Sequence, residues 1–128
     1  MTGTAFLMGR LLSFADTLHR EYCKHVRDGG IPPQLIGNAL MPAAADSPQD
    51  AVDRLRERMI IYKAWADKGD GEEYRLAKWA VGQMGQVCHQ LSQSPLPTET
   101  DQIFRAELFL GYMARPSNEK GQVDETDT

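Results

Sequence analysis

The amino-acid sequence predicts an all-α protein, a small helical bundle of four long helices plus one short helix. Along most of the chain, apolar residues recur at spacings of three and four, the period of one helix face. Between these stretches, proline and glycine gather in short runs that would end helices. β-branched residues are few, and no long alternation of apolar and polar residues indicates a strand.

The first predicted helix runs from about Thr4 to Asp28. Residues 29–33, Gly-Gly-Ile-Pro-Pro, would end it, because glycine and proline in a row break helical geometry. The segment from Gln34 to Leu40 then has room for one or two helical turns before Met41-Pro42-Ala43-Ala44. The apolar stripe of the first helix consists of Leu7, Leu11, Phe14, Leu18, Tyr22 and His25 or Val26.

Two more long helices follow. Residues 47–50, Ser-Pro-Gln-Asp, form a good helix start, since serine can cap, proline suits the first position and an acid suits the first turn. The helix that follows would turn inward Ala51, Leu55, Met59, Tyr62 and Ala66. The next, from about Glu72 to Leu91, would turn inward Ala77, Ala80, Met84, Cys88 and Leu91. Within it, Gly82 and Gly85 either permit close approach of another backbone or simply weaken an exposed face.

The last predicted helix runs from Ile103 to Arg115. It follows a capping sequence at residues 98–101, Thr-Glu-Thr-Asp, and stops before Pro116. Its apolar residues are too many to share one stripe: Ile103, Phe104, Leu108, Phe109, Leu110, Tyr112 and Met113. A helix that is apolar all round is either central in a fold or shared with a partner. Because the apolar residues of the other helices lie on single stripes, a helix shared with a partner is a serious possibility here.

Composition limits the possible classes of function. The chain of 128 residues fits one helical domain, residues 1–115, followed by an acidic, disordered tail, residues 116–128. No apolar run approaches the roughly 18 residues of a membrane span, and no secretory leader is evident. Two cysteines fit free thiols in a cytoplasmic protein. A net charge of −4 argues against a wholly basic nucleic-acid binder, so any such surface must be local.

A cationic row on the first helix is the first candidate site. Arg20, Lys24 and Arg27 follow one another at i, i+4 and i+7, on the half opposite the apolar stripe that also carries Arg10 and Thr17. Such rows hold phosphates through charge and counterion release. The same pattern is also that of a solvated outer face, which every bundle helix has.

A second row, on the helix after Ser47, combines Arg54 and Arg58 with Ile61 and Trp65. Arginine beside an exposed aromatic suits single-stranded nucleic acid, because bases stack on the ring while the guanidinium binds phosphate. It equally suits a protein interface.

Trp79 also points away from the core face of its own helix, so Trp65 and Trp79 are candidate interface residues. The alternative is that both indoles widen the core at its rim.

Metal binding and catalysis have weaker support. The possible zinc ligands are His19, Cys23, His25, Cys88 and His89. No pair among them has the short spacing of zinc motifs, so packing is the simpler interpretation. Neither a glycine-rich phosphate loop nor a nucleophile motif is present. We therefore expect a protein that is not an enzyme and has no cofactor or metal.

Three stretches together resemble a known family: residues 6–12 (Phe-Leu-Met-Gly-Arg-Leu-Leu), residues 35–40 (Leu-Ile-Gly-Asn-Ala-Leu) and residues 110–112 (Leu-Gly-Tyr). They are similar to the C-terminal helical domain of the large subunit of type I CRISPR effector complexes, especially type I-C. That domain is also made separately, from an internal start, as the small subunit. In the family a Leu-Gly-Tyr-Tyr helix closes the domain, whereas here Met113 follows Tyr112.

The resemblance implies a helical bundle present in several copies along a complex that carries a guide RNA. It would contact the large subunit, the backbone subunits and further small-subunit copies. Its basic surface would hold target DNA, chiefly the displaced strand, without nuclease activity. Weak binding by one copy would suffice, because tethered copies raise the effective concentration. On this interpretation the phosphate contacts are Arg20, Lys24, Arg27, Arg54 and Arg58. Phe109 and Met113 on the last helix would face a neighbouring subunit, or the segment from Gln34 to Leu40 would cover part of that surface. The alternative is a helical adaptor that binds proteins only.

Overall fold

A computed structural model describes residues 3–26 and 30–114, and within these ranges it confirms an all-α bundle with no strand. The elements are α1 (Thr4–Val26), α2 (Ile36–Asp46), α3 (Pro48–Lys68), the 3-10 turn η1 (Glu72–Tyr74), α4 (Arg75–Leu91) and α5 (Gln102–Met113). The tail predicted for residues 116–128 and the predicted phosphate contact Arg27 lie outside the described residues.

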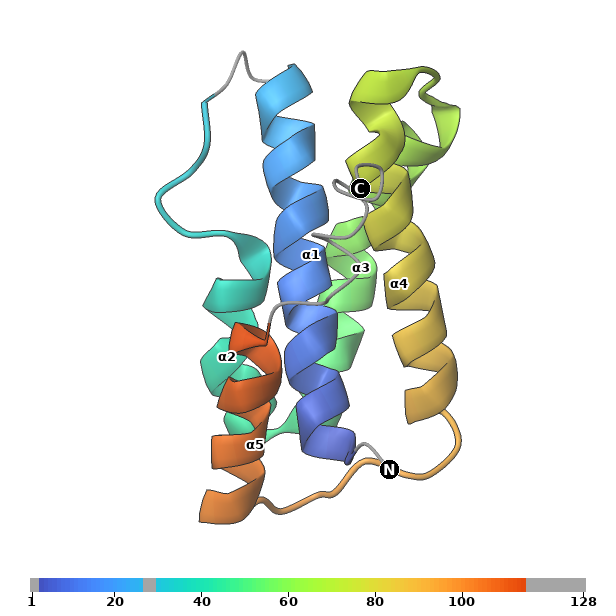
Figure 1. Ribbon diagram of the computed structural model, residues 1–128. Helices are drawn as coiled ribbons and strands as arrows, with labels where there is room; N and C mark the ends of the chain where they lie inside the picture. Colours follow the sequence, from blue (N-terminus) through green and yellow to red (C-terminus); the bar gives the residue numbers. More distant parts are fainter. Residues whose placement is uncertain (1–2, 27–29, 115–128) are drawn as a thin grey trace.

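The central helix is α1, and not the last helix (Figure 1). It packs against α2 and α5 on one side and against α4 and α3 on the other. Its predicted stripe is buried at Leu11, Phe14 and Leu18, but the stripe's end at His25 and Val26 is exposed. Residues on the remaining sides of α1 are buried as well: Met8, Leu12, Ala15, Asp16, Thr17, His19, Glu21 and Cys23. A single apolar stripe was therefore the wrong description of α1.

Helix α2 is longer than predicted, because it continues through Pro42 to Asp46. Proline lacks the N–H that a helix interior uses, and so α2 gives up one backbone hydrogen bond there. Burial offsets this loss, since Ile36, Leu40 and Ala44 all lie in the core. The chain then turns directly into α3, whose first residue is Pro48, as the sequence predicts.

The predicted inward faces of α3 and α4 are largely confirmed. Ala51, Leu55 and Met59 are buried on α3, as are Ala77 and Ala80 on α4.

Lys78 joins the ends of these two helices, since its Nζ donates hydrogen bonds to the carbonyls of Ala66 at 2.9 Å and Asp67 at 3.3 Å. These carbonyls belong to the last turn of α3, where a cation is favourable.

Helix α5 is peripheral and has an apolar outer face, which corrects the prediction that it could be central. Its start is capped as predicted, because the Asp101 carboxylate accepts from the Phe104 N–H at 2.8 Å. Leu108 and Gly111 are its only residues in the buried class. Its most exposed large apolar side chains are Ile103 at 69%, Leu110 at 59%, Met113 at 58% and Phe109 at 55%.

Three glycines bring helix backbones into direct contact with α1. A Cβ on Gly9 would lie 2.1 Å from the Leu108 carbonyl oxygen of α5, and one on Gly111 would lie 2.1 Å from the Phe6 carbonyl oxygen. A Cβ on Gly37 of α2 would lie 2.1 Å from the Leu12 carbonyl oxygen. No side chain fits at these distances. Each of the three stretches that carry the family resemblance contains one of these glycines, so they meet around α1.

Candidate nucleic-acid interface and apolar surfaces

A buried polar cluster on α1 fixes the start of α2. The Asp16 carboxylate accepts from the Gly37 N–H at 2.5 Å and from the Tyr112 hydroxyl. One turn along α1, His19 Nδ1 accepts from the Ile36 N–H at 3.0 Å. Leu35, the residue before α2, offers no side-chain cap. Two α1 side chains therefore satisfy N–H groups that a capping residue would otherwise bind.

Burial dominates the electrostatics of this cluster. Burial raises the pKa of Asp16 above its ordinary value, although hydrogen bonds from Tyr112 and the α2 backbone, and the nearby Arg20 guanidinium, act to lower it. Burial, followed by the hydrogen bond to Asp16 and its negative charge, raises the pKa of Tyr112 to about 12. The cluster ties α1, α2 and α5 together and places Arg20 beside the end of α5.

The cationic residues of α1 lie on the side that faces away from α3. We define the α1 row as Arg10, Arg20 and Lys24. Asp16 contacts α5 and Phe14 contacts α4, whereas Leu11 and Leu18 line a cleft with α3. The helical period then puts the α1 row on the remaining side, between α4 and α5. In Figure 1 this is the side of α1 between those two helices, facing the viewer.

The α1 row is more deeply set than a solvated stripe. Arg10 and Arg20 are half-buried, whereas Lys24 is exposed and forms an ion pair with Glu21 at 3.2 Å. Thr17, predicted to be on the outer half, is buried at 9% exposure. The reason is that α4 and α5 both pack against α1, so more than one face of this helix is covered. The sequence prediction of the row's direction is thus right for Arg20 and Lys24 and wrong for Thr17.

Arg10 was listed on this half of the helix but was not among the predicted contacts. Its guanidinium carbon lies 5.2 Å from the centroid of the Phe14 ring, and Phe14 in turn meets Trp79 of α4 edge-on at 5.4 Å. Arg10 Nε and Trp79 Nε1 are buried and have no hydrogen-bond partner within the structure. Both donors are therefore enclosed by the fold beside one phenyl ring, where an unpaired N–H is unfavourable.

Few carboxylates oppose the α1 row. Helix α4 contains no Asp or Glu, and the two acids of α1, Asp16 and Glu21, are buried. Acidic residues concentrate instead on α3, η1 and the loops. The surface shared by α1 and α4 is consequently cationic in a chain whose net charge is −4.

The second predicted row lies elsewhere. Arg54 forms an ion pair with Asp50 at 3.0 Å, and Arg58 is exposed. Both are on α3, which packs on the side of α1 opposite the α1 row. The two predicted rows therefore do not form one continuous surface.

Both tryptophans pack at the rim of the core, as the alternative interpretation predicts. Trp65 is half-buried in a cluster of rings: Tyr22, His25 and Tyr74. Trp79 is half-buried against Phe14.

The exposed apolar surface of α5 lies opposite its buried face. Ile103, Ala106, Leu110 and Met113 recur at spacings of three and four, with Phe109 beside them. We call these five residues the α5 stripe. Phe109 and Met113, predicted to face a neighbour, both belong to it. Large exposed apolar surfaces of this kind mark interaction sites.

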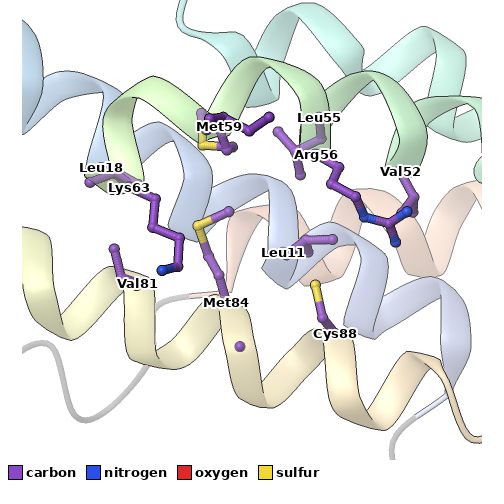
Figure 2. Close-up of a pocket in the computed structure, with 12 residues that line it drawn as sticks. Leu11, Leu18, Val52, Leu55, Arg56, Met59, Lys63, Val81, Met84 and Cys88 are labelled. Atoms are coloured by element: carbon purple, nitrogen blue, oxygen red, sulfur yellow. The ribbon is translucent and has the colours of Figure 1, made fainter. Parts of the chain in front are cut away.

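A second apolar surface is a cleft of about 260 Å³ between α3 and α4 (Figure 2). Leu11 and Leu18 of α1 form its floor. Its walls are apolar side chains from both helices: Val52, Leu55, Met59 and Ile60 from α3, and Val81 and Met84 from α4.

Arg56 and Lys63 stand at the α3 edge of the cleft, and Gly85 and Cys88 on α4. Burial raises the pKa of the Cys88 thiol, which the Arg56 guanidinium acts to lower. No local sequence pattern predicts the cleft, because it depends on how far apart two helices lie.

The described residues contain no group of three or more His, Cys, Asp or Glu side chains placed to hold a metal ion. The side chains of the zinc interpretation have other roles instead. His19 binds the α2 backbone and stacks on Tyr62, and Cys88 lines the cleft. Within the same residues, no helix combines the length and hydrophobicity of a membrane span.

Comparison with protein-family models, curated proteins and solved structures finds no match to this chain. The resemblance to the CRISPR subunit therefore stays a prediction, supported by the residues quoted for it.

Proposed function

We propose that the chain is a non-catalytic subunit of a type I CRISPR RNA-guided complex, corresponding to its small subunit, and that it binds target DNA. Its partners would be the large subunit, the backbone subunits and further copies of itself, around a guide RNA in the cytoplasm. The displaced strand is the proposed ligand, because it leaves its phosphates available once the guide has paired with the complementary strand.

The observation that carries this proposal is the α1 row beside an acid-free α4. Arg10, Arg20 and Lys24 lie on one side of α1, α4 has no Asp or Glu, and the two acids of α1 are buried, Glu21 in an ion pair with Lys24. Phosphate oxygens are acceptors with the charge that such a surface favours. Arg27 continues the spacing of the row in the sequence and remains a proposed contact.

The test compares the assembled complex with and without the row. Replacing Arg20, Lys24 and Arg27 together with alanine should weaken DNA binding and lower the slope of log K against log salt by about 0.7 for each lost contact to a single strand. The pair Arg54→Ala and Arg58→Ala tests the second predicted row separately, because these arginines lie on α3, on another side of the molecule. An unchanged affinity and salt slope in the triple variant would remove Arg20, Lys24 and Arg27 from the proposal.

A second candidate function is a helical adaptor that contacts proteins without nucleic acid. The α5 stripe favours it, since exposed apolar side chains of this size suit a protein partner. The adaptor predicts that Phe109→Ser with Met113→Ser abolishes association with partner proteins, while no variant of the α1 row changes DNA binding in any assembly. Recovery of RNA-guided complex subunits in a pull-down, with DNA binding that depends on the row, would exclude it.

A further inference from the structure

We infer that the cleft between α3 and α4 binds an amphipathic helix of another protein, one that carries carboxylates beside its apolar stripe. This inference goes beyond the proposed function, because it concerns a surface on another side of the bundle and needs no nucleic acid. It depends on the shape of the cleft, the charges at its mouth and two glycines on α4.

The length of the cleft matches about three turns of a helix, whose apolar side chains would enter it. Its lining extends along α3 from Val52 to Lys63, which at 1.5 Å per residue is about 16 Å, or three helical turns. The walls are α3 and α4, and the floor is α1. A helix laid between the walls would complete a group of four around a shared apolar centre, the usual arrangement of a bundle. It would contact apolar side chains on three sides.

The charges at the mouth select for acidic flanks. Arg56 and Lys63 reach from α3 toward α4 across the cleft (Figure 2). They stand seven residues apart, so they lie along one line. No carboxylate faces them from α4, which has none. Their present partners are exposed acids of their own helix: Asp53 at 3.8 Å from Arg56 and Asp67 at 2.8 Å from Lys63. Exposed pairs of this kind are weak enough to be exchanged for carboxylates of a partner.

The glycines of α4 leave room for a backbone. A Cβ on Gly82 or on Gly85 would meet nothing within 4 Å, so packing inside this chain does not require either glycine. Gly85 lines the cleft and Gly82 does not. A side chain at position 85 would thus intrude on a docked helix, whereas one at position 82 would not.

The probe is a synthetic helix of about four turns with leucine at i, i+3, i+4 and i+7 and glutamate beside the stripe, stapled on its outer face because short helices are marginal alone. A matched peptide has lysine in place of glutamate. We expect the isolated chain to bind the glutamate peptide and not the lysine peptide. Nonspecific attraction to a chain of net charge −4 would give the opposite preference.

Variants locate the binding site. Gly85→Leu should weaken binding by about tenfold or more, whereas the control Gly82→Leu should not change it. Arg56→Glu with Lys63→Glu should reverse the preference to the lysine peptide. The control pair Lys68→Glu and Arg75→Glu alters net charge equally without touching the cleft. Bound peptide should also slow alkylation of Cys88 by iodoacetamide, and Cys23 is too buried to react.

Several results would overturn the inference: no binding of the glutamate peptide at millimolar concentration, equal effects of the two glycine variants, or equal binding of both peptides. Concentration-dependent dimerisation that Gly85→Leu abolishes would also overturn it, because the occupant would then be a second copy of this chain. Loss of DNA binding in the α1 row variant, with peptide binding intact, would separate this surface from the proposed function.

Discussion

The same residue type, glycine, plays opposite roles in two regions of the molecule. Around Gly9, Gly37 and Gly111, backbones touch and a side chain is excluded. Around Gly82 and Gly85, nothing lies within 4 Å of where a side chain would be. The first region is a closed junction of α1, α2 and α5, and the second is an open junction of α3 and α4. The difference teaches that a glycine in a helix indicates close contact only when a neighbour is present.

The largest effect should come from adding a methyl group at the closed junction, where the backbones already touch. Gly111→Ala puts a Cβ 2.1 Å from the Phe6 carbonyl oxygen, so α5 must move away from α1. We expect the free energy of unfolding to fall by about 3 kcal/mol or more, the upper end for overpacked cores, because the contact is with backbone that has no rotamer to change. Urea denaturation measures it. Wild-type stability in this variant would show that the two helices do not touch.

A smaller loss should follow from removing the polar cap of α2. Asp16→Ala leaves the buried Gly37 N–H and the Tyr112 hydroxyl without their acceptor, which should cost about 1–3 kcal/mol. Tyr112→Phe removes only one donor and should cost about 1 kcal/mol. Tyr112→Phe serves as the control, because it leaves the hydrogen bond between Asp16 and the Gly37 N–H in place. Equal losses would mean that the α2 backbone does not depend on Asp16.

The stability that Asp16 contributes should depend on pH, because its pKa is raised in the folded protein. A carboxyl whose pKa is higher in the folded state binds its proton more tightly there, so its contribution to stability is fully present below its unfolded pKa and is lost as pH rises through its folded pKa. The stability of the wild type relative to Asp16→Asn should therefore be greatest below about pH 4 and decline above it. Urea titrations of both proteins across this range test the sign, and a difference that grows with pH would contradict it.

The smallest effect, and the only gain, is expected at the open junction. Gly82→Ala adds a methyl group where no atom lies within 4 Å, so it should stabilise α4 by about 0.5–1 kcal/mol through the unfolded chain. Thermal denaturation of the two glycine-to-alanine variants should show a higher melting temperature for Gly82→Ala and a lower one for Gly111→Ala than for the wild type. A loss at position 82 would mean that its surroundings are occupied.

Local sequence signals predict the fold class and most helix bounds, but not which helix is central. The starts of α3 and α5 were predictable from local residues: proline suits the first position of α3, although Ser47 makes no side-chain cap, and Asp101 caps α5. The roles of Asp16 and His19 were not predictable, since their hydrogen-bond partners lie on α2, 17 to 21 residues further along the chain.

For the candidate site, the directions of side chains on one helix were predictable, but the distances between helices were not. The helical period gives the direction of Arg20 and Lys24 without a structure. The orphaned donors of Arg10 and Trp79, and the cleft, depend on distances between helices that no spacing encodes.

The cap that α1 supplies to α2 has a consequence for the order of folding. The N–H groups of Ile36 and Gly37 find their acceptors on residues that precede them by 17 and 21 positions, not on their own loop. A chain that has not yet docked α1 leaves the first turn of α2 open to water, and Pro42 weakens the helix further. The formation of α2 is therefore tied to tertiary docking, and the hydrogen-exchange protection of its first amides should report the free energy of separating α1 from α2.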